Sequence, residues 1–77
     1  MFIVNQNETE IVNVDNLIEI QLDDNVIWGI NNVGKIPLGD YETDEKAKEA
    51  FEKIMTDLFP KEEYGIYMIG ASVYMPK

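Results

Sequence analysis

The sequence predicts an α+β fold: a mostly antiparallel sheet of four to five strands with one amphipathic helix packed on one face. Three observations support this prediction. Short apolar stretches separated by polar turns occupy residues 1–41, a segment with helical periodicity follows at residues 43–58, and an apolar, aromatic stretch lies at residues 64–75. A chain of 77 residues is expected to form a single domain, residues 1–77. Because one helix covers only one side of such a sheet, the other side is expected to face water or a partner.

The first predicted element is a hairpin formed by residues 2–4 and residues 10–13. Both segments are short and mainly apolar, which is typical of strands. Gln6, Asn7 and Glu8 between them are polar and are expected to form the turn.

A meander of three strands is predicted next. In its first strand, Ile18, Ile20 and Leu22 alternate with polar residues, which is the period of a half-buried strand. Gly34 can adopt a positive φ in the second turn. Pro37 cannot donate to a ladder, which places the last strand at an edge or places Pro37 near the start of that strand. The predicted strands span residues 17–22, 26–31 and 36–41, separated by turns at residues 23–25 and 32–35.

Residues 43–58 are predicted to form the one helix. Thr43 is a suitable N-cap, and Asp44 and Glu45 lie where the positive end of the helix dipole stabilises carboxylates. Pro60 is expected to end the helix. Apolar residues recur at spacings of three and four and form one face, which comprises Ala47, Ala50, Phe51, Ile54 and Leu58.

The last predicted strand spans residues 64–75. This segment is rich in Tyr, Ile and Val, which favour strands, and a bend or bulge is expected near Gly70. Ser72, the only serine in the chain, is expected to be a packed strand residue. It is not predicted to be a nucleophile, because the chain has no histidine to act as its base.

The composition and charge exclude several classes of function. The chain has no Cys and no His, and its six basic residues are all lysines, so disulfides, Cys/His metal sites and catalytic triads cannot be built. The net charge of −9 argues against direct contact with nucleic acid or an anionic membrane, because each phosphate contact needs a cation. No apolar run approaches the roughly 18 residues of a membrane span. We therefore predict no enzyme activity, no cofactor and a cytoplasmic location.

Asp23 and Asp24 are the most plausible metal ligands, with Asp40 or Glu42 supplied by a nearby loop. A calcium loop needs acidic or amide side chains at alternating positions, a central Gly and a terminal Glu. That spacing does not occur here, so the pair predicts a turn, and no metal site is expected.

The aromatic residues are candidates for contact with a partner, because they bury a large area and Tyr and Trp keep one polar group. The same residues also pack strands and cores. Trp28 is the one predicted to be exposed or at an interface, because Gly29 is expected to leave its indole unshielded on one side. The aromatic residues considered are Trp28, Tyr41, Tyr64, Tyr67 and Tyr74.

Two stretches of the chain resemble a known group of proteins. The first stretch combines I-V-N-Q-N at residues 3–7 with I-V-N-V-D-N-L at residues 11–17. The second combines L-G-D-Y-E-T-D-E-K-A-K-E-A-F-E-K-I at residues 38–54 with Y-M-P at residues 74–76. Together they resemble a widespread group of small proteins encoded by phages and prophages. The resemblance implies a phage or mobile-element origin, hence the cytoplasm of a host cell, and it implies no catalytic residues.

The leading hypothesis is a non-enzymatic interaction protein that inhibits a host protein with a basic surface. DNA carries one negative charge per about 1.7 Å of axis, and rows of carboxylates can imitate it in the nucleic-acid channel of a host nuclease, such as a CRISPR effector. Glu8 and Glu10 belong to the wider set of candidate carboxylates. The predicted partner-binding residues are Asp15, Glu19, Asp23, Asp24, Trp28, Asp40, Glu42, Asp44 and Glu45.

The alternative hypothesis is a homo-oligomeric structural or accessory phage protein. In that case the acidic residues serve only to keep a small protein soluble, and the aromatic residues form the contacts between copies. Salt separates the two hypotheses, since binding through charges weakens with salt and an apolar interface does not.

Overall fold

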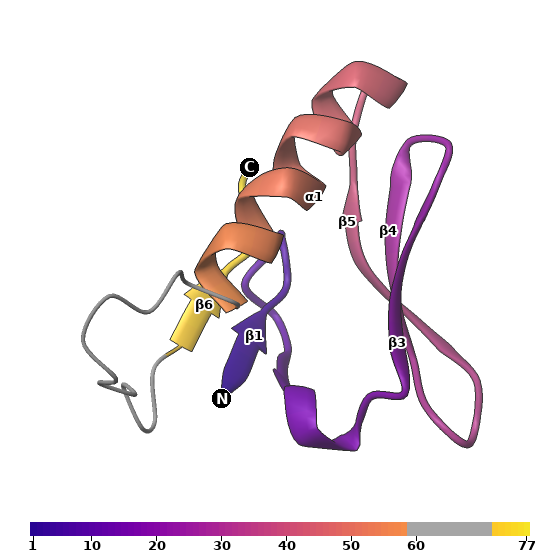
Figure 1. Cartoon of the computed structure of the whole chain (residues 1–77), viewed down its shortest axis with the longest axis vertical. Coiled ribbons are helices and arrows are strands. Elements are labelled where there is room, and N and C mark those ends of the chain that lie inside the picture. Colours follow the sequence, from indigo (N-terminus) through magenta and orange to yellow (C-terminus); the bar gives the residue numbers. More distant parts are fainter. Residues whose placement is uncertain (59–71) are drawn as a thin grey trace.

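The computed structural model describes residues 1–58 and 72–77. One α-helix, one short 3-10 helix and six strands follow one another along these residues (Figure 1). The elements are β1 (Phe2–Val4), β2 (Ile11–Asn13), the 3-10 helix η1 (Val14–Asn16), β3 (Glu19–Asp23), β4 (Val26–Ile30), β5 (Lys35–Asp40), α1 (Asp44–Leu58) and β6 (Ser72–Tyr74).

The strands form two sheets of three strands each, in the orders β2-β1-β6 and β3-β4-β5. The α+β class is confirmed, and so is the antiparallel pairing of β1 with β2 and of β3 with β4 and β5. The prediction of one sheet of four to five strands is wrong. The chain changes direction at η1, where Asn13 Oδ1 accepts a hydrogen bond from Asp15 N at 3.0 Å, and β1 pairs in parallel with β6 instead of extending the meander.

One helix packs against both sheets, because α1 contacts β3 and β4 of the meander and β6 of the other sheet (Figure 1). Its N-cap is confirmed, since Lys46 N donates to Thr43 Oγ1 at 3.1 Å. The apolar face predicted for the helix is also confirmed, with Phe51 partly buried and the other four residues buried.

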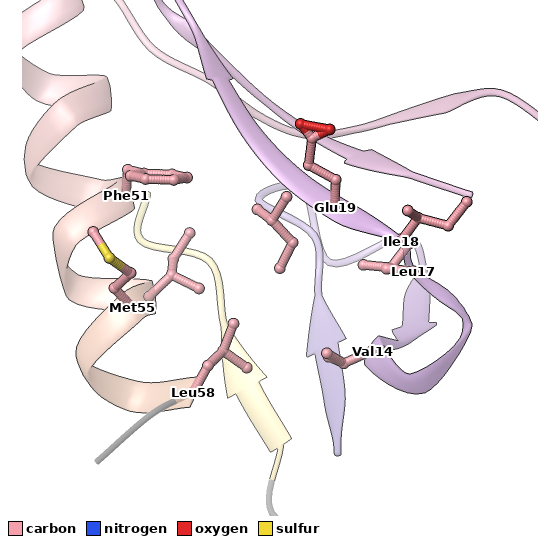
Figure 2. Close-up of a pocket in the computed structure, with 9 residues that line it drawn as sticks. Val14, Leu17, Ile18, Glu19, Phe51, Met55 and Leu58 are labelled. Atoms are coloured by element: carbon pink, nitrogen blue, oxygen red, sulfur yellow. The ribbon is translucent and has the colours of Figure 1, made fainter. Parts of the chain in front are cut away.

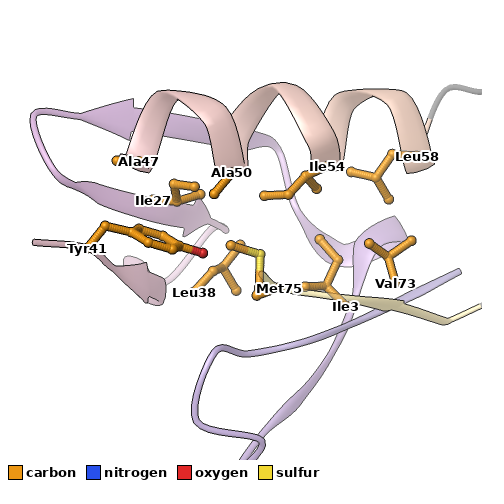
Figure 3. Close-up of a cluster of buried hydrophobic side chains, with 10 residues drawn as sticks. All are labelled: Ile3, Ile27, Leu38, Tyr41, Ala47, Ala50, Ile54, Leu58, Val73 and Met75. Carbon is orange, nitrogen blue, oxygen red and sulfur yellow. The ribbon is translucent and has the colours of Figure 1, made fainter. Parts of the chain in front are cut away.

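The hydrophobic core lies between α1 and the facing sides of the two sheets (Figure 3). The side chains of Ile3, Ile27, Leu38 and Ile54 are almost fully buried there. The core cluster comprises Ile3, Ile27, Leu38, Tyr41, Ala47, Ala50, Ile54, Leu58, Val73 and Met75. Because this core draws on β1, β4, β5, α1 and β6, each sheet buries its apolar side only when the helix is in place.

The turns differ from the sequence prediction in one respect. The positive φ angles of non-glycine residues occur at Glu8 (59°) and Asp24 (53°), in the β1–β2 and β3–β4 connections. Gly34, which is free to take a positive φ, does not have one. Pro37 lies on β5, which is an edge strand as predicted.

The predicted strand at residues 64–75 is only partly covered by the described residues. Within them, β6 forms at Ser72–Tyr74 and pairs with β1. The rest of that prediction, including Tyr64, Tyr67 and the bend near Gly70, lies outside the described residues, as does the predicted stop at Pro60.

Candidate functional site

Six exposed carboxylates gather at one end of the molecule, which we call the acidic end. The β3–β4 turn and the beginning of α1 lie at this same end, at the top of the view (Figure 1). Asp40 joins them because it pairs with Val26, directly across β4 from Asp23. The acidic end comprises Asp23, Asp24, Asp40, Glu42, Asp44 and Glu45.

Asn25 holds the acidic end together. Its Nδ2 donates to the carbonyl oxygen of Tyr41 at 2.7 Å and to Asp40 Oδ1 at 3.2 Å, and its own carbonyl oxygen accepts from Tyr41 N at 2.9 Å. These bonds tie the β3–β4 turn to the end of β5, so the carboxylates on both elements keep a fixed relation.

The negative charge of the acidic end is little neutralised within the chain. In the part of the chain that the structure describes, its one ion pair joins Lys46 Nζ to Glu42 Oε2 at 3.3 Å, between two exposed side chains. Such exposed pairs contribute little, because water screens them. Exposed carboxylates are acceptor-only groups, and they therefore suit the ammonium and guanidinium groups of a partner.

Two predicted partner-binding carboxylates do not belong to the acidic end. Asp15 lies on η1, and Glu19 begins β3, whose other end carries Asp23. Of the wider candidate set, Glu8 is already paired with Lys77 Nζ at 3.3 Å. The carboxylates of the first half of the chain are therefore distributed over different surfaces, as expected when strands and turns separate them.

The side of the β3-β4-β5 sheet that faces away from α1 carries Trp28, and we call it the outer face. Ile20, Leu22 and Ile36 pack against the core, so the residues next to them in sequence point the other way. The outer face consists of three rows across the sheet, namely Asp23, Val26 and Asp40; Gln21, Trp28 and Pro37; and Glu19, Ile30 and Lys35.

Trp28 is half-buried on this outer face. Its ring makes a cation–π contact with Lys35, whose Nζ lies 5.8 Å from the ring centroid. Gly29 has a different role from the one predicted. It is buried on the opposite face, where a Cβ atom would lie 3.3 Å from Leu17 Cδ1, so its missing side chain makes room for Leu17 and does not uncover the indole.

An apolar groove lies between the second half of α1, the beginning of β3 and η1 (Figure 2). It has a volume of about 240 Å³, and Phe51, Met55 and Leu58 line its helical side. The groove is not predictable from the alternating pattern, which places Ile18 inside the strand, whereas Ile18 precedes β3 and is 69% exposed. The remaining lining residues are Val14, Leu17, Ile18, Glu19, Ile20 and Ile54.

A second apolar surface lies on the β2-β1-β6 sheet, on the side away from the core, and we call it the apolar face. Its exposed members are Phe2, Ile11 and Tyr74, and Val4, which faces the same side, is buried. Phe2 is 39% exposed, Ile11 70% and Tyr74 60%. Ile11 and Tyr74 lie on either side of Val4 in one row across the sheet. The sequence does not reveal this row, because strands of three residues are too short to show a clear alternation.

The carboxylates do not converge on a common point. Among residues 1–58 and 72–77, no three Asp or Glu side chains lie close enough together to hold a metal ion. Within the same residues, no helix is long and apolar enough to cross a membrane. No known protein family, no curated protein and no solved structure matches this chain.

Proposed function

We propose that this protein is a non-enzymatic interaction protein whose acidic end docks on a basic, nucleic-acid-binding surface of another protein. The observation that carries the proposal is the acidic end itself. It places six exposed carboxylates on connected elements, and within residues 1–58 and 72–77 Lys46 is the single cation paired with them. A net charge of −9 adds long-range attraction to a basic partner and speeds the encounter.

The arrangement of these carboxylates supports an imitation of nucleic acid. Asp23 and Asp40 flank β4 and are therefore two strand spacings apart, about 10 Å between their backbones. Glu42, Asp44 and Glu45 continue the negative surface onto the beginning of α1. A protein groove that binds phosphates at short intervals with Lys and Arg would meet a similar spread of negative charge here. The resemblance to phage-encoded proteins points to a host partner, such as a nuclease of a CRISPR-type defence system.

The experiment is a pull-down from host lysate at about 0.1 M and about 0.5 M salt, conditions that shorten the Debye length from roughly 10 to roughly 4 Å. We expect a nucleic-acid-binding protein at the lower salt only, and we expect added duplex DNA to displace it. The double variant Asp23→Lys/Glu45→Lys should lose this protein. The matched control Asp15→Lys/Glu19→Lys makes the same change in net charge at two residues outside the acidic end, and it should retain the protein.

Recovery that survives high salt, or that falls equally in both double variants, would contradict the proposal. The first result would indicate an apolar interface, and the second a nonspecific effect of net charge.

A homo-oligomeric structural or accessory role is the second candidate, and the exposed apolar face is the observation that favours it. Phe2, Ile11 and Tyr74 are all exposed on one side of the same sheet, and neighbouring exposed apolar side chains are typical of interaction sites. Light scattering between about 10 and 500 μM tests it, because a dimer with a weak interface shows a mass that rises over such a range. A monomeric mass throughout, unchanged in Ile11→Lys, would exclude self-association.

A further inference from the structure

Trp28 occupies the middle of the outer face, between a row of carboxylates and a row that contains a lysine. Asp23 and Asp40 lie in the neighbouring row on one side, and Lys35 lies in the neighbouring row on the other. Adjacent rows on one side of a sheet are about 7 Å apart, so a cation over the indole lies within range of both carboxylates. Trp28 does not belong to the core cluster, so its ring is not committed to the interior.

The chain already places a cation on this ring. Lys35 Nζ lies 5.8 Å from the centroid, within the distance at which an ammonium is attracted to an aromatic face. Lys35 is exposed and long, and a surface lysine is free to exchange this contact for water. The position of this ammonium shows that the exposed side of the indole can accept a cation.

An unused hydrogen-bond acceptor lies beside the same ring. Gln21 is directly opposite Trp28 in the β3–β4 register, so both side chains are on the outer face. Gln21 Oε1 is buried and has no hydrogen-bond donor among the described residues. The last torsion of a glutamine is soft, so this oxygen can turn towards a donor that arrives at the ring.

We propose that the outer face is a binding site for an arginine of the basic partner, with the guanidinium stacked on Trp28 in place of the Lys35 ammonium. A guanidinium stacks on an aromatic face and donates at its edge simultaneously, so it can also reach Gln21 Oε1, which a compact ammonium on the ring does less well. Asp23 and Asp40 hold the next positive side chains of the same segment. This inference rests on the proposed function, because it names the partner group that the acidic surface receives.

The test uses hexa-arginine and hexa-lysine peptides, which have equal charge, and the fluorescence of Trp28, the only tryptophan. At about 0.05 M salt we expect hexa-arginine to change the emission and to bind at least about threefold more tightly than hexa-lysine. Lys35→Met removes the competing ammonium and should tighten hexa-arginine binding about threefold. Gln21→Met should reduce the preference for arginine over lysine.

Lys53→Met is the matched control, because it makes the same change in net charge on the exposed side of α1. Equal tightening in Lys35→Met and Lys53→Met, or binding of hexa-arginine without a change in emission, would overturn the inference. A natural partner that is captured through the acidic end but binds Lys35→Met like the wild type would leave the proposed function standing and refute only the arginine site. If hexa-arginine bound selectively at Trp28 but the pull-down gave no protein that DNA displaces, the arginine site would stand and the proposed function would be refuted.

Discussion

The ring of Tyr41 lies directly over Gly39. A Cβ atom added at Gly39 would be 2.8 Å from Tyr41 Cε2 and 2.9 Å from Tyr41 Oη, both closer than such atoms approach in proteins. Tyr41 is buried and cannot move aside freely, since it belongs to the core cluster. We therefore expect Gly39→Ala to lower the free energy of unfolding by about 1–3 kcal/mol through overpacking, measured by urea denaturation.

Gly34 provides the matched control for this prediction. A Cβ atom there would meet nothing within 4 Å, and the residue has no positive φ. Gly34→Ala should therefore leave the free energy of unfolding within about 0.5 kcal/mol of the wild type. If both alanine variants were equally destabilised, close packing under Tyr41 would not be the cause.

Asn5 is expected to be the polar residue whose loss costs most stability in the β1–β2 connection. It is 8% exposed, and its Oδ1 accepts from Thr9 N at 2.8 Å and from Glu10 N at 3.0 Å. Asn5→Ala leaves these two backbone donors without a protein acceptor, so the free energy of unfolding should fall by about 2 kcal/mol. Thr9→Ala removes only the acceptor of Asn5 Nδ2 and should cost about 0.5–1 kcal/mol in the same denaturation experiment.

The cap of α1 can be tested with the two threonines of this region. Thr43 Oγ1 accepts from Lys46 N at 3.1 Å, whereas Thr56 Oγ1 donates to Glu52 O at 3.1 Å inside the helix. Thr43→Ala should reduce the free energy of unfolding by about 1 kcal/mol, and Thr43→Ser should restore most of it. Thr56→Ala should be neutral or slightly stabilising, because alanine has the higher helix propensity. A larger loss at position 56 than at position 43 would contradict the assignment of the cap.

Stability at alkaline pH should depend on Tyr41. Burial raises the pKa of its hydroxyl above the ordinary value of 10.0, and this neutral hydroxyl donates to Pro76 O at 2.6 Å. The stabilisation is fully present below the unfolded pKa, and it is lost as the pH rises from about 10 through the raised pKa. Between about pH 9 and about pH 11, the free energy of unfolding should therefore fall less in Tyr41→Phe than in the wild type. Equal losses in urea denaturation would show that this hydroxyl does not contribute.

Local patterns predicted most elements of the fold but not their assembly. The cap at Thr43 and the helical spacing depend on neighbouring residues, and the structure confirms both. The predicted alternation is confirmed for Ile20 and Leu22, which pack against the core, but not for Ile18, which precedes β3 and is 69% exposed. The division into two sheets depends on the pairing of β1 with β6, near the two ends of the described chain. No local pattern in strands of three residues specifies that partner, which is selected by the core that both strands share with α1.

The candidate surfaces were predictable to a similar extent. The sequence identified the carboxylates and Trp28 but could not group them, because grouping depends on register and on the bonds of Asn25 to Tyr41 and Asp40. The contact of Lys35 with Trp28 follows from the same register, since Lys35 pairs with Ile30 beside the tryptophan row. The charge count therefore supports a proposal about the kind of partner, and the strand pairing determines which of these residues share a surface.

Because β1 and β6 pair in parallel, the resistance of the molecule to a pulling force should depend on the direction of that force. The two strands run side by side in the same sense, so residue 1 precedes one strand and residue 77 follows the other at the opposite end (Figure 1). A force applied between these residues acts along both strands and loads their hydrogen bonds together, including the one from Met75 N to Val4 O. A force that separates the two arms of the β3–β4 hairpin would instead open one bond after another. The fold should therefore withstand a larger force between residues 1 and 77 than a force that separates β3 from β4.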